Sequence, residues 1–137
     1  MSTNNRTVCI VDDDREITIL FHEALKSIGG ITILTFTDPV LALEHFQVNE
    51  YAYVLVISGF KMPGLNGMEF LKKIKELNRF VRTILMTAFE IEDKKFRDYT
   101  KSKIIDAFLQ KPIRIHDLIK EVDTQLHSYE NQKRFPS

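Results

Sequence analysis

The feature that most constrains the fold of this chain is a regular alternation of short apolar runs and longer amphipathic segments. Five apolar runs recur along the sequence, at residues 8–11, 31–36, 54–57, 83–86 and 107–109. Segments in which apolar residues recur with the three-to-four-residue spacing of a helix separate and follow them. Five strand and helix pairs in alternation predict an α/β fold, with a parallel sheet, helices on both faces and right-handed crossovers.

The predicted helices differ in how strongly apolar residues anchor them. The second should begin at Asp38, an N-cap followed by proline at the first helical position, and the third should follow Gly67. The fifth should run from about residue 113 to at least 126. The first helix has a wide apolar stripe made of Ile17, Leu20, Phe21, Ala24, Leu25 and Ile28. The third has a comparable stripe made of Phe70, Leu71, Ile74 and Leu77.

The fourth predicted helix, between residues 90 and 103, is the exception. It is dense in charged residues and has only Ile91, Phe96 and Tyr99 as apolar anchors. A helix with few buried contacts is easily displaced. We therefore expect this helix to be the least stable of the five.

Length and composition allow one domain. The chain has 137 residues, of which 44% are hydrophobic, enough for one compact core. We assign residues 1–6 to an N-terminal tail, 7–127 to the domain and 128–137 to a polar C-terminal extension. Its 19 basic and 19 acidic residues cancel, and no apolar run is long enough to span a membrane. Without a signal-peptide pattern, we expect a cytoplasmic protein that binds neither nucleic acid nor membrane directly.

Polar residues stand where the predicted strands end. Ligands of open parallel sheets bind beyond the carboxyl ends of the strands. Clustered carboxylates repel one another unless a proton or a cation joins them, and Mg2+ prefers oxygen ligands. Asp14 taken alone is better placed as the N-cap of the first helix. The residues at the strand ends are Asp12, Asp13 and Asp14, then Gly59, then Thr87 and Ala88, then Lys111 and Pro112.

The motifs that carry these residues resemble those of receiver domains of two-component response regulators, over about residues 7 to 127. They are VDDD at 11–14, MPGLNG at 62–67, MTA at 86–88 and FLQKP at 108–112. The resemblance implies a flavodoxin-like, doubly wound sheet of five parallel strands in the order 2-1-3-4-5, with five helices. It also implies a stand-alone signalling module in a phosphorelay rather than an enzyme.

The same resemblance implies roles for single residues. Asp12 and Asp13 would hold Mg2+ with help from the backbone carbonyl of Lys61. Thr87 and Ala88 would line the phosphoryl pocket.

By that resemblance, Thr87 would bond a phosphoryl oxygen, Lys111 would neutralise its charge, and Phe108 would be the aromatic residue whose rotation reports phosphorylation. The partners would be a histidine kinase or a downstream effector. They would bind the face made by the fourth helix, fifth strand and fifth helix, and a homodimer is also allowed.

Gly59 departs from the pattern of the family. The family has an aspartate at the tip of the third strand, and that aspartate accepts the phosphoryl group from the kinase. Glycine offers no nucleophile and removes one metal ligand, so we expect no phosphorylation at residue 59 and only weak Mg2+ binding. Ser58 should not substitute, because successive strand side chains point to opposite faces. The sequence fits a natural pseudo-receiver and an engineered variant equally.

One alternative comes from another class of protein. Asp12 and Asp14 form a D-x-D pattern after the first strand, as in haloacid-dehalogenase-like phosphatases. Glu16 stands where that pattern has a small or branched residue, and no later acidic pair follows the fourth strand. Because of these two departures, we keep this phosphatase only as the alternative function.

Overall fold

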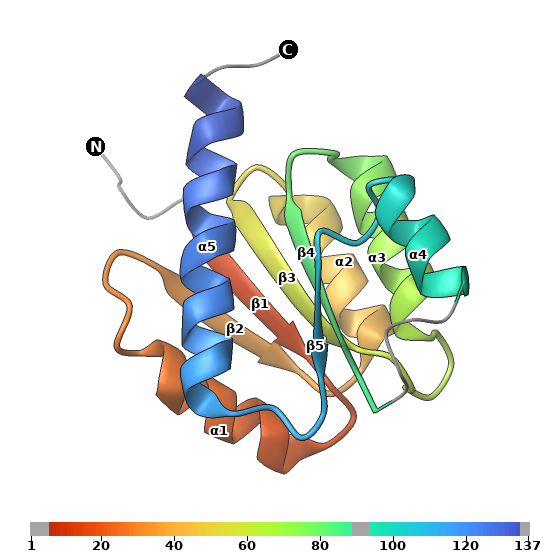
Figure 1. The fold of residues 1–137 in the computed structure, drawn as a ribbon, viewed down its shortest axis with the longest axis horizontal. Helices are drawn as coiled ribbons and strands as arrows, with labels where there is room; N and C mark the ends of the chain where they lie inside the picture. The colour runs from red at the N-terminus through yellow and green to blue at the C-terminus, as the bar shows by residue number, and fades with distance from the viewer. Residues whose placement is uncertain (1–5, 89–93, 135–137) are drawn as a thin grey trace.

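The computed structural model describes residues 6–88 and 94–134, apart from the side chains of residues 95, 96, 133 and 134. In this part of the chain, strands and helices alternate as the sequence predicts (Figure 1). The elements are β1 (Thr7–Val11), α1 (Arg15–Leu25), β2 (Thr32–Phe36), α2 (Pro39–Asn49), β3 (Tyr53–Gly59), α3 (Gly67–Leu77), β4 (Arg82–Thr87), α4 (Lys94–Lys101), β5 (Ala107–Gln110) and α5 (Ile115–Arg134).

The strands form one parallel sheet in the order β2-β1-β3-β4-β5, which confirms the predicted doubly wound fold. Helices α1 and α5 cover one face, and α2, α3 and α4 cover the other (Figure 1). Because both faces are covered, every residue of the central strands β1 and β3 is buried. The fold thus directs the carboxyl ends of its central strands to one common rim.

The core lies in two clusters, one on each face of the sheet. Phe46 of α2 and Phe70 of α3 belong to the first cluster, and Phe21 of α1 and Leu118 of α5 belong to the second. All four side chains are at most 1% exposed. The predicted apolar stripes therefore do anchor their helices to the sheet.

Short polar side chains set where three helices begin. The carboxylates of Asp14 and Asp38 each accept a hydrogen bond from the backbone N–H two residues later, at 3.0 and 2.9 Å. Asn66 accepts from the N–H of Glu69 at 2.9 Å and donates its amide to the Glu69 carboxylate at 2.8 Å. These contacts satisfy N–H groups that a helix leaves unpaired at its start. The predicted start of the second helix at Asp38 is confirmed.

Some sequence expectations were wrong at the edges of elements. Leu20 of the first stripe and Leu77 of the third are exposed, because the stripes are wider than the strip of each helix that faces the sheet. Helix α1 ends at Leu25, before Ile28. In the fourth helix, Tyr99 is half-buried, whereas Ile91 and the side chain of Phe96 lie outside the described residues.

Helix α5 continues to Arg134, beyond the predicted start of a polar extension at residue 128. Tyr129 is only 8% exposed and packs with the core cluster beneath α5. The boundary after residue 127 therefore lies inside a helix. Among the helices of residues 6–88 and 94–134, none combines the length and apolar character that crossing a membrane requires.

Candidate functional site

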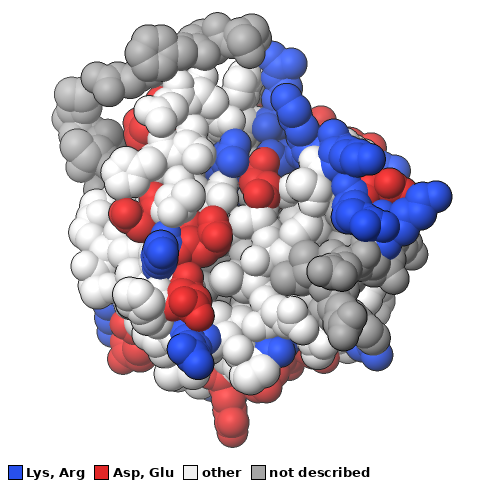
Figure 2. Space-filling view, in the orientation of Figure 1, with Lys and Arg blue, Asp and Glu red and all other residues white. Residues whose placement is uncertain are grey.

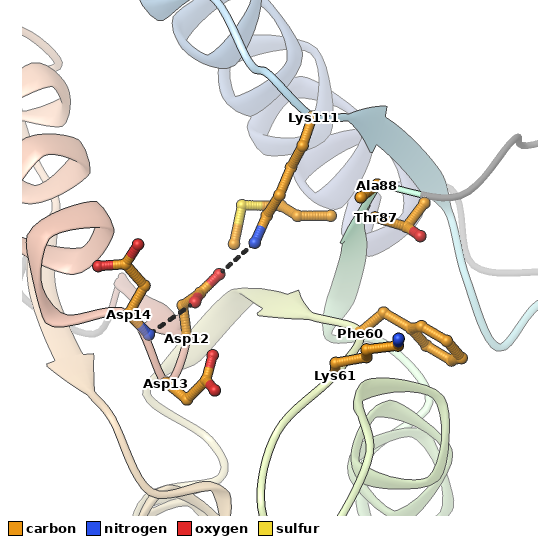
Figure 3. A pocket seen from close by; sticks show the side chains of 9 residues that line it. Asp12, Asp13, Asp14, Phe60, Lys61, Thr87, Ala88 and Lys111 are labelled. Atoms are coloured by element: carbon orange, nitrogen blue, oxygen red, sulfur yellow. Dashed lines mark hydrogen bonds and ion pairs between the residues drawn. The ribbon is translucent and has the colours of Figure 1, made fainter.

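A pocket of about 320 Å³ opens at the rim where the central strands end (Figure 3). Because the strands of a parallel sheet run in the same direction, their carboxyl ends lie along one edge, and residues far apart in the sequence meet there. The residues that line it are Asp12, Asp13, Asp14, Phe60, Lys61, Met86, Thr87, Ala88 and Lys111. Six of the eight predicted rim residues line this pocket, and Gly59 and Pro112 do not. No role at the pocket was predicted for Phe60, or for Met86 beyond its place in the MTA motif, because an apolar side chain at a strand end has no distinctive sequence signal.

Asp12 is the central charged group of this pocket. It is 1% exposed, and its Oδ2 atom lies 3.1 Å from Nζ of Lys111. Its Oδ1 atom accepts a hydrogen bond from the backbone N–H of Asp14 at 2.9 Å. Both carboxylate oxygens are therefore engaged, and a lysine supplies the counter-charge that a buried carboxylate needs.

Gly59 lies next to this ion pair, at the buried end of β3. A Cβ atom placed on Gly59 would lie 2.7 Å from Oδ2 of Asp12 and 3.1 Å from its Cγ. Its φ is outside the left-handed region, so the backbone alone does not demand glycine. The carboxylate of Asp12 thus occupies the space that a side chain at residue 59 would need.

The predicted metal ligands do not converge. Figure 3 shows the carboxylates of Asp12, Asp13 and Asp14 pointing in different directions, with Lys61 on the opposite side of the pocket. Asp13 and Asp14 are exposed, and the Asp14 carboxylate caps α1, as predicted. Within the described ranges, no three His, Cys, Asp or Glu side chains are grouped so that they could hold a metal. The carboxylates of Asp12, Asp13 and Asp14 therefore do not together form a metal site of three acidic ligands in this arrangement.

The other predicted residues stand around the rim as follows. Thr87 ends β4 and is 1% exposed, and the backbone N–H of Lys111 donates to its carbonyl at 2.8 Å. Phe108 lies in β5, half-buried against the cluster beneath α2 and α3, and outside the pocket lining. The Ser58 hydroxyl donates to the Gly59 carbonyl at 2.8 Å and lies away from the pocket, as predicted.

The phosphatase alternative has little support in this geometry. It requires the carboxylates of Asp12 and Asp14 to act together on a substrate. The Asp14 carboxylate accepts the N–H of Glu16 instead, and the Asp12 carboxylate is held by Lys111. The two acids therefore serve separate structural contacts.

A second polar cluster, which was not predicted from the sequence, lies at the amino ends of β4 and β5. The Asp106 carboxylate accepts from Nζ of Lys75 at 2.8 Å and from the backbone N–H of Thr83 at 2.9 Å, and it lies 3.6 Å from the Arg82 guanidinium. Burial lowers the pKa of Lys75, and the neighbouring Asp106 charge opposes that shift. Asp106 stands directly before an apolar run, which is the only signal the sequence offers.

Comparisons with known proteins agree with this architecture. The family model for the response regulator receiver domain matches residues 8–123. The DNA-binding transcriptional regulator NtrC of Escherichia coli K12 is 28% identical over 127 residues, which is 93% of this chain and 26% of NtrC. Sporulation initiation phosphotransferase F of Bacillus subtilis is 34% identical over 85 residues, which cover 62% of this chain and 66% of that protein.

Solved structures share this fold. An uncharacterized protein from Neptuniibacter caesariensis superposes with a TM-score of 0.83 at 27% identity, over 97% of this chain and 96% of that one. A response regulator receiver domain from Clostridium thermocellum shares the fold, with a TM-score of 0.80 at 23% identity over 91% and 97% of the two chains. The chain spans about a quarter of the length of NtrC. It belongs to the response regulator receiver domain family.

Proposed function

We propose that this receiver domain signals through contacts with other proteins and does not accept a phosphoryl group at residue 59. The family works in two-component signalling, and its receiver domains are in general signalling modules rather than enzymes. The observation that carries the proposal is the end of β3, where Gly59 has no side chain and the Asp12 carboxylate fills the space beside it. The domain is thus a pseudo-receiver in this form.

The chemistry of phosphorylation supports this proposal. A carboxylate oxygen must attack the phosphorus of the donor and form an acyl phosphate, while the donor's leaving group departs. Residue 59 offers no such oxygen. The oxygens of Asp12 are engaged by Lys111 and by the N–H of Asp14, and the Asp14 carboxylate caps a helix. Thr87, Ala88 and Lys111 therefore line a phosphoryl pocket that has no acceptor at residue 59.

Receiver domains typically bind Mg2+ at this rim. We propose that Asp12, Asp13 and the carbonyl of Lys61 hold it only weakly here, because Gly59 removes one ligand and Asp12 faces Lys111. When bound, such a cation would supply positive charge beside a phosphoryl oxygen. The resting contacts of the pocket do not require it.

Receiver domains act with histidine kinases and effector domains. We propose that the kinase or effector binds the face made by α4, β5 and α5, on which Phe108 acts with Thr87 as the switch pair. Figure 2 shows Lys and Arg side chains gathered over α4, where Lys94, Arg97 and Lys101 are exposed. A polar, positively charged surface suits reversible protein contact. A homodimer is an additional partner in this proposal, and the cytoplasm is the proposed location.

The test is labelling with a small phosphoryl donor. The protein is incubated with acetyl phosphate and Mg2+ and then measured by intact mass spectrometry. We expect no stable adduct on the unaltered chain and a phosphoryl adduct on Gly59→Asp. Gly59→Asn is the matched control, because it has the same size but no nucleophilic carboxylate. A mass gain on the unaltered chain that maps to a pocket residue would overturn the proposal.

A further inference from the structure

We propose that Gly59 is present because it makes room for Asp12 to pair with Lys111, and that this internal ion pair takes the place of a divalent cation at the rim. The inference rests on the proposed function in one respect, since it concerns the same pocket without an acceptor at residue 59. It goes further by giving glycine a positive role. On this view Gly59 is part of a built contact and does more than remove a nucleophile.

The space beside Gly59 is filled by the Asp12 carboxylate. A Cβ on Gly59 would lie 2.7 Å from Oδ2, 3.1 Å from Cγ and 3.7 Å from Oδ1 of Asp12. The first of these distances is too short for a carbon and a carboxylate oxygen in van der Waals contact, since such atoms are best separated by roughly 3.5 Å. Any side chain at residue 59 must therefore move the strand end or the carboxylate.

The Asp12 carboxylate would move more easily than the end of β3. The strand end is held by the N–H of Phe60, which donates to the Met86 carbonyl at 3.0 Å, and by the N–H of Gly67, which donates to the Phe60 carbonyl at 2.7 Å. The Gly59 carbonyl also packs closely against Gly67, where even a Cβ would not fit. With the backbone held on both sides, the Asp12 side chain is the part that has to give way.

Lys111 supplies the charge that balances the buried Asp12 carboxylate. Asp12 is 1% exposed, and a carboxylate so deeply buried needs a partner of opposite charge. Lys111 provides it at 3.1 Å, across 99 positions of sequence, and ties the loop after β5 to the loop after β1. A divalent cation that used Oδ2 of Asp12 would have to displace the lysine, because two cations at one oxygen repel each other.

The effect of Gly59→Ala on the melting temperature distinguishes a glycine that makes room for Asp12 from a glycine that is only a missing acceptor. Replacing glycine by alanine where φ is compatible ordinarily stabilises a protein, because the unfolded chain loses freedom. If Gly59 were only a missing acceptor, Gly59→Ala would therefore raise the melting temperature. If the space beside Gly59 holds Asp12, the same change breaks the ion pair and lowers the melting temperature.

The experiment is thermal unfolding of the whole chain with and without millimolar MgCl2, and with no phosphoryl donor. We expect the melting temperature of the natural chain to be unchanged by Mg2+. Gly59→Ala should melt lower by about 3 to 6 °C without Mg2+, the shift expected for about 1 kcal/mol in a domain of this size. It should recover part of that loss with Mg2+, because Asp12 is released for the cation although alanine adds no ligand.

Lys111→Met removes the ammonium and leaves the strand untouched, so it carries the test if Gly59→Ala fails to fold. It should also acquire a response to Mg2+. Lys73→Met is the matched control, because it removes the same charge from an exposed position of α3 that lies outside the pocket lining. Its response to Mg2+ should equal that of the unaltered chain.

Two results would overturn the inference: a Gly59→Ala variant more stable than the natural chain, or a natural chain stabilised by Mg2+ as strongly as Lys111→Met. Because no phosphoryl donor is present, neither result bears on the labelling experiment. Conversely, an adduct in that experiment would overturn the proposed function and leave the Asp12 and Lys111 contact intact.

Discussion

Two largely buried carboxylates lie at opposite ends of the strands, and their surroundings differ. Asp106 stands at the amino end of β5, within reach of Lys75, Arg82 and the backbone N–H of Thr83. Asp12 stands at the carboxyl end of β1, where Lys111 is its ion-pair partner among the described residues, and it borders a pocket of about 320 Å³. One carboxylate is enclosed by partners, and the other faces an open space.

The difference shows which polar cluster is structural and which belongs to a site. A buried polar group whose partners surround it joins elements rigidly, as Asp106 joins α3, β4 and the start of β5. A carboxylate with a single exchangeable counter-ion beside a pocket can change partners when a ligand or a substitution intervenes. The rim is therefore where a change of partners is expected, whereas the amino-end cluster should stay fixed.

The largest expected effect comes from breaking the enclosed cluster. Asp106→Ala leaves the ammonium of Lys75 and the guanidinium of Arg82 without their carboxylate, in a region where these side chains are 11% and 20% exposed. Removing one partner of a buried pair costs about 3 to 5 kcal/mol. Urea unfolding followed by circular dichroism should show a loss of free energy of unfolding of that size.

Glu76→Gln is the control for this change, because Glu76 lies on the same helix as Lys75 but is exposed. Its free energy of unfolding should stay within about 0.5 kcal/mol of the natural chain. Equal effects of the two substitutions would mean that Asp106 has no special structural role, and the contrast between the two carboxylates would fail.

A smaller effect is expected from crowding the rim with a second carboxylate. Gly59→Asp displaces the Asp12 carboxylate and places two acids around one lysine, so without metal the variant should be less stable by about 2 kcal/mol. Mg2+ should recover much of this loss, because it can bridge the two carboxylates. Thermal melts with and without Mg2+ measure both effects. Identical midpoints and identical Mg2+ responses in the variant and the natural chain would contradict this argument.

The stability of the buried sheet should fall at alkaline pH because of Cys9 in β1. Burial raises the pKa of Cys9 above its usual 9.0. Above pH 9.0 the unfolded chain loses the thiol proton and the folded chain keeps it, so stability falls as pH rises, by up to about 1.4 kcal/mol per pH unit. Denaturant unfolding at a series of pH values should show this slope, and Cys9→Val should reduce it. The part that remains belongs to Tyr53, because burial also raises its pKa from the usual 10.0. A slope in Cys9→Val equal to that of the unaltered chain would assign the effect to another group.

The smallest effect tests whether Asp14 belongs to the rim or only to its helix. Asp14→Ala and Asp38→Ala each remove an N-cap and should each cost about 1 kcal/mol in free energy of unfolding. Neither should alter the response of the protein to Mg2+. A change in that response in Asp14→Ala alone would add Asp14 to the functional residues of the pocket.

Much of the fold could be predicted from the sequence, because the signals are local. The order of strands and helices follows from apolar periodicity, and the start of α2 follows from Asp38 and Pro39 standing side by side. The rim residues could also be named, since each follows a strand. The exposure of Leu20 and the full length of α5 could not be predicted, because both depend on which surfaces neighbouring elements cover.

By itself, the sequence determined the alternation of elements, the residues at the strand ends and the absence of a nucleophile at residue 59. Only the tertiary structure decided how the charges pair: Lys111 with Asp12 across 99 positions, and Lys75 with Asp106 across 31. Such pairs depend on how the sheet and helices pack, and no local pattern encodes them. Packing also put the Asp12 carboxylate into the space beside Gly59, because a glycine at the end of a buried strand leaves room that the nearest charged side chain can enter.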